Sequence, residues 1–144
     1  MILLDVNVLV HAFQEASPEH AAYREWLAAT VEGDEPIGVS ELVLSGFVRI
    51  ATHPRVFDRP APVAEALAFA DVLRSQPNAV VVAPGTRHWE IFGRLCVTAG
   101  AKGNLVADAY LAAIAIESGS EWITGDRDFS RFPGLRWRHP LADA

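Results

Sequence analysis

The sequence predicts an α/β fold, in which a mostly parallel central sheet is covered by helices on both faces. Short runs of apolar, β-type residues alternate along the chain with longer segments of helical periodicity. Strands separated by segments of that length need crossover connections, and such crossovers join parallel strands. The 144 residues suffice for one hydrophobic core and contain no linker or repeat, so we expect a single domain over residues 1–144.

Each short apolar run is a candidate strand, and five strands are expected, at residues 2–6, 37–39, 79–83, 121–124 and 135–138. Five long helices are expected between them: one from Pro18 to near Gly33, then 41–52, about 62–75, 87–99 and one between Asn104 and Gly119. All but the third of these helices begin near a residue whose side-chain oxygen can accept a hydrogen bond from the first turn: Ser17, Ser40, Thr86 and Asn104.

The balance of charge excludes a strongly basic nucleic-acid-binding module. The chain has 18 Asp and Glu against 12 Lys and Arg, and its net charge is −6. Four of these acids are candidates for a metal site, as described below. Without them the count is 14 acids against 12 bases, so the composition is compatible with an RNA partner.

The single cysteine and the N-terminus bear on where the protein acts. Cys96 has no partner for an internal disulfide, which fits a reducing compartment. On the helix expected at 87–99 it shares a stripe with Trp89, Phe92 and Ala99, so we expect a buried structural thiol. The N-terminus lacks the basic segment of a signal peptide, and no apolar run is long enough to span a bilayer. We therefore expect a cytoplasmic protein without a membrane segment.

Four acids adjoin segments that should form the core. They are found at the end of the first strand, at the start of the helix 41–52, inside the last long helix and after the fourth strand: Asp5, Glu41, Asp108 and Asp126. Carboxylates beside buried elements are costly unless a cation neutralises them. The carboxyl ends of parallel strands meet at one edge of a sheet, so we expect all four to lie there, pointing toward the sheet or its rim. The simplest cation to receive them is a divalent metal.

The donor set indicates which metal and which chemistry. Carboxylates are hard oxygen ligands that suit Mg²⁺ or Mn²⁺, whereas the five histidines show no spacing typical of zinc sites. The chain has neither a Walker phosphate-binding loop nor the Gly-x-Ser-x-Gly elbow of serine hydrolases. These patterns favour metal-assisted hydrolysis of a phosphodiester.

Six short motifs occur in order along almost the whole chain: ILLDVNVL at 2–9, SELVLSGFVR at 40–49, HPRVF at 53–57, NLVADA at 104–109, TGDRDF at 124–129 and FPGLR at 132–136. Each motif alone is weakly specific, and their order and spacing carry the comparison. In these motifs the chain resembles the PIN-domain ribonucleases and, among them, the VapC-type toxins of bacterial toxin–antitoxin pairs.

This resemblance implies an α/β/α sandwich and an endoribonuclease that depends on Mg²⁺ or Mn²⁺. It also implies a homodimer and a VapB-type antitoxin that blocks the site. The implied metal ligands are Asp5, Glu41, Asp108 and Asp126. Asn7, where PIN domains often have Ser or Thr, would support the site by donating a hydrogen bond.

The sequence alone leaves open which residue is the fourth acid, whether the domain is catalytic and which residues contact RNA. Asp128 lies two residues after Asp126 and is an alternative fourth acid, although we expect it to cap or brace the turn before Phe129. A non-catalytic PIN-like module that binds RNA or protein is an alternative function. A phosphoryl-transfer enzyme with a nucleophilic Asp5 is disfavoured because Asn7 replaces the second Asp that such enzymes use. Arginines that could contact the RNA backbone are Arg49, Arg55, Arg127 and Arg131.

Overall fold

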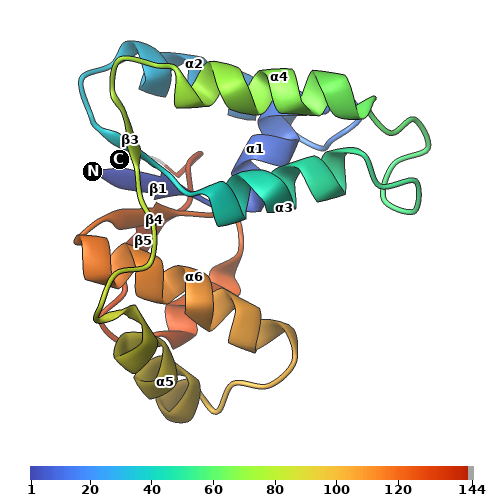
Figure 1. The fold of residues 1–144 in the computed structure, drawn as a ribbon. Coiled ribbons are helices and arrows are strands. Elements are labelled where there is room, and N and C mark those ends of the chain that lie inside the picture. Colours follow the sequence, from blue (N-terminus) through green and yellow to red (C-terminus); the bar gives the residue numbers. More distant parts are fainter. Residues whose placement is uncertain (143–144) are drawn as a thin grey trace.

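In the computed structural model, which describes residues 1–142, all five strands run parallel to their neighbours (Figure 1). They form one sheet with the order β3-β2-β1-β4-β5. The strands are β1 (Ile2–Leu4), β2 (Ile37–Val39), β3 (Ala79–Val81), β4 (Glu121–Ile123) and β5 (Trp137–Arg138). Each lies within one of the five predicted segments, so the predicted parallel sheet is confirmed.

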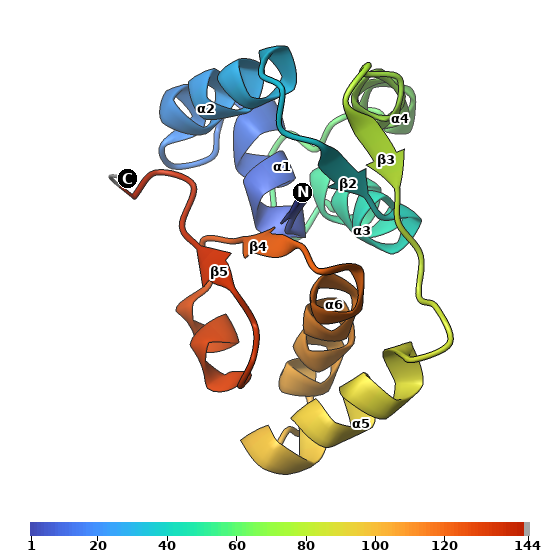
Figure 2. The same cartoon turned by 90° about the vertical axis from the view of Figure 1, so that its left-hand side faces the viewer.

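The helices form a layer on each side of this sheet. They are α1 (Val6–Phe13), α2 (His20–Glu32), α3 (Glu41–Ala51), α4 (Val63–Arg74), α5 (His88–Ala99) and α6 (Asn104–Ser118), followed by the 3₁₀ helix η1 (Arg127–Arg131). The first four pack together on one side, and α5 pairs with α6 on the other (Figures 1 and 2). The predicted α/β/α sandwich is therefore present. Within residues 1–142 no helix is both long and apolar enough to cross a bilayer.

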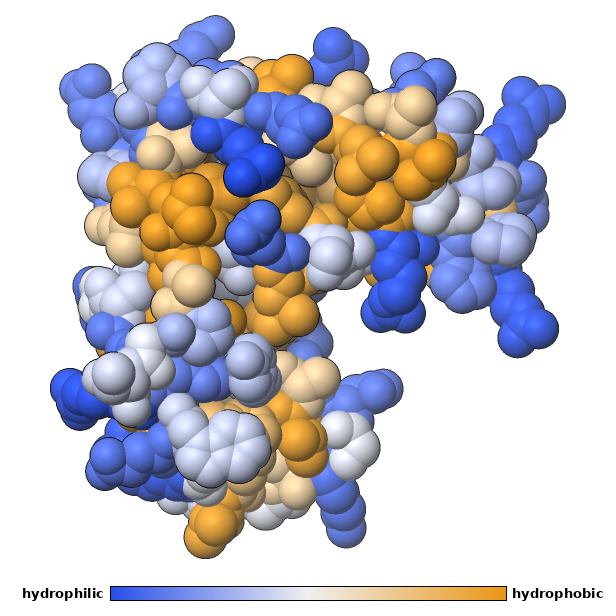
Figure 3. Space-filling view, viewed as in Figure 1, coloured by the Kyte–Doolittle hydropathy of each residue, from blue (hydrophilic) through white to orange (hydrophobic). Residues whose placement is uncertain are grey.

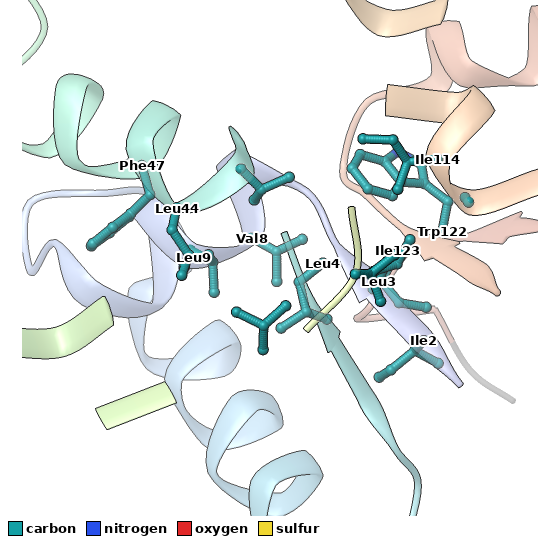
Figure 4. Close-up of a cluster of buried hydrophobic side chains, with 14 of the residues drawn as sticks. Ile2, Leu3, Leu4, Val8, Leu9, Leu44, Phe47, Ile114, Trp122 and Ile123 are labelled. Atoms are coloured by element: carbon teal, nitrogen blue, oxygen red, sulfur yellow. The ribbon is translucent and has the colours of Figure 1, made fainter. Parts of the chain in front are cut away.

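The core lies on both faces of the central strand β1, all three residues of which are buried. Figure 4 shows Val8 and Leu9 of α1 packed with Phe47 of α3 on one face of the sheet. On the other face Ile114 of α6 lies beside Trp122 of β4. A strand covered by helices on both faces needs apolar residues at successive positions, which explains the uninterrupted run that begins at Ile2.

The first strand is shorter than predicted because a helix begins immediately after it. Val6 was expected to end the strand, but it is the first residue of α1, a helix that was not among those predicted. Asp5 causes the change of direction: it is the N-cap of α1, and its Oδ1 accepts a hydrogen bond of 2.7 Å from the Val6 backbone N–H.

Of the four residues predicted to cap the N-termini of helices, three do not do so. Ser40 caps α3 as predicted, accepting a hydrogen bond from the Val43 N–H. By contrast, α2 begins after Glu19, whose left-handed conformation leaves Ser17 outside the cap, and α6 begins after Gly103. No side chain of its own segment caps α5. Glu117 of α6 accepts hydrogen bonds from the backbone N–H groups of Gly85 (2.6 Å) and Arg87 (2.9 Å), so a tertiary contact replaces the predicted Thr86 cap.

The buried face of α5 also differs from the prediction. His88, Ile91 and Leu95 are its buried residues, whereas Trp89 is 73% exposed and Cys96 is half-buried. The buried stripe therefore lies one residue before the predicted one. His88 donates a hydrogen bond of 2.9 Å from Nε2 to a carbonyl oxygen of α6, and this contact sets the face that α5 turns inward.

Candidate active site

The order of the strands creates one place where neighbouring connections diverge. From β1 the chain passes to β2 and β3 on one side, then crosses to β4 on the other side of β1. In open parallel sheets, ligands bind at such a switch point, beyond the carboxyl ends of the two strands. Asp5 follows β1 and Asp126 follows β4 after two intervening residues. The fold therefore brings these two acids to the expected edge.

Asp5 is held rigidly at this edge. Its side chain is only 6% exposed and accepts three hydrogen bonds. Oδ1 accepts from the Val6 N–H (2.7 Å), and Oδ2 accepts from the hydroxyl of Thr124 (2.7 Å) and the amide of Asn7 (3.2 Å). These bonds fix the direction of the carboxylate, as in sites where a ligand must be oriented before the metal binds.

Thr124, the residue that directly follows β4, joins the two acids. Its fully buried hydroxyl donates to Asp5 and accepts a hydrogen bond of 2.9 Å from the backbone N–H of Asp126. Asn7 adds a second link, because its Oδ1 accepts a hydrogen bond of 3.1 Å from the Gly125 N–H. From the sequence, Thr124 was expected to end a strand and to begin the TGDRDF motif, with no role of its own in the site. Its position pointed to such a role, because a hydroxyl residue here follows an apolar strand and precedes an acid by two positions.

Burial and mutual repulsion raise the pKa of two acids at this edge. The pKa of Asp5 rises from 3.8 to about 6, mainly because burial disfavours the charged carboxylate. Asp108 and Asp126 raise it further by repulsion, against the lowering effect of its hydrogen bonds. The pKa of Asp108, in the first half of α6, also rises to about 6, first through burial and then through repulsion by Asp126 and Asp128.

Asp126, rather than Asp128, caps the short helix that follows β4. Oδ1 of Asp126 accepts a hydrogen bond of 2.9 Å from the Asp128 N–H and so caps η1. Of the two roles expected for Asp128, capping or bracing this turn, capping is wrong because Asp126 is the cap. Asp128 is exposed, and both acids repel the charge of Asp108.

Glu41 is placed differently from the other three predicted ligands. It begins α3, but its side chain is 75% exposed and one of its oxygens lies 3.9 Å from the guanidinium of Arg74 on α4. The expectation that Glu41 points toward the sheet rather than into solvent is therefore wrong. At this distance and exposure the ion pair contributes little stability, so the side chain is held only weakly.

The acids fit a divalent cation in donor type and charge. Within residues 1–142 no group of three or more His, Cys, Asp or Glu side chains is already arranged to hold a metal ion, so Asp5, Asp108 and Asp126 would have to come closer together to bind one. None of the ion pairs formed within this part of the chain involves Asp5, Asp108 or Asp126. No cationic side chain of the described residues offsets the repulsion among these carboxylates, and carboxylate oxygens are hard donors. They are therefore suited to Mg²⁺ or Mn²⁺.

Replacing Asp108 by Asn is expected to stabilise the metal-free protein at neutral pH. The raised pKa makes the folded state bind a proton that the unfolded state has already lost, so stability falls as pH rises from about 4 to about 6. Asn cannot ionise and removes this loss. Because Asp108 is partly exposed, we expect a gain of about 1 kcal/mol at pH 7.5 that disappears below pH 4.

Urea denaturation in a chelator, at pH 7.5 and pH 4, measures this difference. Asp34→Asn, at an exposed position before β2, is the matched control and should change stability little at either pH. An Asp108→Asn variant less stable than the wild type at pH 7.5 would show that Asp108 is stabilised by contacts rather than strained by repulsion.

Fold and geometry together define a class: α/β domains with carboxylates gathered at the switch point of a parallel sheet. The sequence pattern of the PIN domain family matches residues 2–135. The chain is 45% identical over 98% of its length to "VapC ribonuclease Mb2897" of Mycobacterium bovis, covering 96% of that protein. It is 39% identical over 97% of its length to "Ribonuclease VapC25" of Mycobacterium tuberculosis, covering 99% of it. The chain therefore belongs to the PIN domain family.

Solved structures share the fold. The crystal structure of VapBC2 from Rickettsia felis, bound to a DNA fragment from its promoter, matches with a TM-score of 0.70 at 19% identity, over 96% of this chain and 98% of that one. Mycobacterium tuberculosis VapC20, described as a sarcin–ricin loop cleaving toxin, matches with a TM-score of 0.68 at 16% identity, over 94% and 99% of the two chains.

Proposed function

We propose that this protein is a VapC-type endoribonuclease that depends on Mg²⁺ or Mn²⁺, the toxin of a toxin–antitoxin pair. The observation that supports the proposal is the position of Asp5 and Asp126 after neighbouring strands at the switch point of a PIN-domain sheet, with Asp108 near enough for its charge and that of Asp126 to raise the pKa of Asp5. Its relatives at 39–45% identity over nearly the whole chain are named as VapC ribonucleases. We further propose that residues 1–144 form one nuclease domain that acts in the cytoplasm.

The chain's own residues prepare the site for the metal. Asp5, Asp108 and Asp126 would hold it, and the hydroxyl of Thr124 keeps Asp5 aligned with the backbone of Asp126. We include Glu41 as a fourth ligand, reached when its exposed side chain turns away from Arg74. When bound, such an ion activates water and neutralises charge on a phosphodiester.

Exposed arginines would contact the RNA backbone. Arg127 and Arg131 belong to η1, which begins directly after Asp126, and Arg55 lies after α3. None of these three forms an ion pair with any of residues 1–142. Contacts of arginine with phosphate oxygens position RNA without reading its sequence.

The proposed partners follow from the relatives. Several structural neighbours are complexes named VapBC, in which the nuclease is paired with VapB. We propose that this chain forms a homodimer and binds a VapB-type antitoxin that blocks the acids. A basic side chain of the antitoxin placed among the carboxylates would neutralise the charge that the metal otherwise neutralises.

Incubation of the purified protein with mixed cellular RNA, with Mn²⁺ or with a chelator, tests the proposed function. We expect cleavage with Mn²⁺ only, and products with a 5′-phosphate, because water is the nucleophile. RNA that is bound but never cut would instead support the alternative, a non-catalytic PIN-like module.

The same assay ranks the two neighbouring acids after β4. Asp126→Asn is expected to reduce cleavage more than Asp128→Asn, because the backbone of Asp126 is tied to Thr124 whereas Asp128 is exposed. Gel-based initial rates of the two variants make the comparison. The reverse order would identify Asp128 as the fourth acid of the site.

A further inference from the structure

A pocket of about 440 Å³ lies between α3 and α6. Figure 3 shows the molecule hollowed between the helices α1–α4 and the pair α5 and α6, with hydrophobic side chains on the inner wall. The pocket, called the α3–α6 pocket below, is lined by Val6, Leu42, Arg49, Ala107, Tyr110 and Leu111, together with Gly46. Its volume is within the range of sites that bind small organic groups.

This pocket adjoins the acids along the chain. Val6 directly follows Asp5, and Ala107 directly precedes Asp108. Leu42, a third lining residue, follows the fourth predicted ligand, Glu41. An RNA phosphodiester at the acids would therefore have a neighbouring nucleotide within reach of the pocket.

The chemistry of the wall fits a flat aromatic ring. Tyr110 is half-buried and held by edge contacts with His88 and Phe92, at centroid distances of 4.3 and 5.6 Å. Arg49 is exposed and is the one charged residue of the lining. Aromatic rings and arginine guanidinium groups are the surfaces on which proteins stack unpaired RNA bases.

Gly46 lets α3 lie close to Val6 at the wall of the pocket. A Cβ atom added at Gly46 would lie 3.0 Å from Cγ2 of Val6, which is closer than ordinary van der Waals contact. The close packing of α1 against α3 beside the pocket therefore depends on a residue without a side chain.

We propose that the α3–α6 pocket binds one unpaired base of the RNA substrate, next to the phosphodiester that is cut. Tyr110 stacks on the base and Arg49 stacks on it or donates a hydrogen bond to its edge, so these two residues determine specificity. The inference rests on the proposed nuclease function and adds how the same site selects its substrate. Single-stranded RNA is favoured because a base in a duplex is not available for stacking.

Cleavage of short RNAs with a randomised central segment, in Mn²⁺, tests the proposal. Sequencing of the products should show that the wild type prefers one base at a fixed position beside the cut. Tyr110→Leu and Arg49→Gln should flatten this preference and raise KM about tenfold, with kcat nearly unchanged, because one stacking contact is lost. An abasic nucleotide at that position should weaken cleavage by the wild type similarly and add no further loss in Tyr110→Leu.

A second pocket supplies matched control variants. It also combines an arginine with an aromatic ring, Arg24 and Phe69, but none of its lining residues adjoins a predicted metal ligand in the chain. Arg24→Gln and Phe69→Leu should leave base preference and KM unchanged. Melting temperatures of all four variants establish that differences in cleavage do not come from unfolding.

Each contrary result has a distinct meaning. No Mn²⁺-dependent cleavage by the wild type would overturn the proposed nuclease function itself. Cleavage by both pocket variants with unchanged base preference would overturn only the base pocket. A uniform loss over all sequences in Arg49→Gln would assign this residue to phosphate binding and remove it from the pocket's specificity role. Conversion of a dimer to monomers by Tyr110→Leu, or loss of antitoxin binding with base preference intact, would assign the pocket to a protein partner and overturn the proposal.

Discussion

Asp5→Asn and Asp108→Asn are each expected to lower RNA cleavage at least about a hundredfold while the protein remains folded. Both substitutions remove a negative oxygen donor that a divalent metal requires. In Asp5→Asn the amide oxygen can take the place of Oδ1 and still accept the hydrogen bond from the Val6 N–H, so the cap of α1 is kept. The amide NH2 then takes the place of Oδ2 and cannot accept from the hydroxyl of Thr124. Initial rates on a common RNA, at saturating Mn²⁺, measure the loss.

Asp34→Asn is the control for this experiment, because it makes the same chemical change at an exposed position away from the sheet edge. Wild-type rates in Asp5→Asn and Asp108→Asn would refute the assignment of the site. Glu41→Gln decides the position of the fourth ligand: a loss similar to that of Asp5→Asn would mean that the side chain leaves Arg74 during catalysis, whereas an unchanged rate would remove Glu41 from the ligand set.

Mn²⁺ is expected to raise the melting temperature of the wild type by about 6–10 °C at neutral pH. An ion that binds only the folded state at a hundredfold excess over its Kd stabilises that state by about 2.7 kcal/mol, which corresponds to a shift of this size in a domain of this length. Binding also relieves the repulsion among Asp5, Asp108 and Asp126.

The effect of pH on this stabilisation has a definite sign. Without metal, Asp5 and Asp108 have pKa values near 6, so protons compete with Mn²⁺ as pH falls through that value. The shift should be full at pH 7.5, smaller at pH 6 and nearly absent at pH 5. Thermal scans at the three pH values test this, and Asp5→Asn should show little shift at any of them. An equal shift in Asp5→Asn and the wild type would place the ion elsewhere.

The main features of the fold follow from local patterns in the sequence. Apolar runs bounded by turn residues predict all five strands, and the intervening helical segments require the parallel arrangement. Once the strands are parallel, acids that follow them must lie at one edge, which is why Asp5 and Asp126 could be placed without a structure. For Asp108 the sequence predicted only a position at the edge of the apolar face of α6. How far its side chain is buried depends on the packing of α6 against β4.

Features that depend on distant partners were decided by the tertiary structure alone. Thr124 bonds to Asp5 across 119 positions of the chain, and no local pattern predicts this pairing. Glu41 lies near Arg74 of the neighbouring helix α4. On α5 the buried side chain is His88 rather than Trp89, because His88 contacts the neighbouring helix α6. The sequence by itself therefore determined which elements form and where the acids gather along the sheet. Side-chain directions, hydrogen-bond partners and the α3–α6 pocket depend on contacts between segments far apart in the chain, so only the tertiary structure decided them.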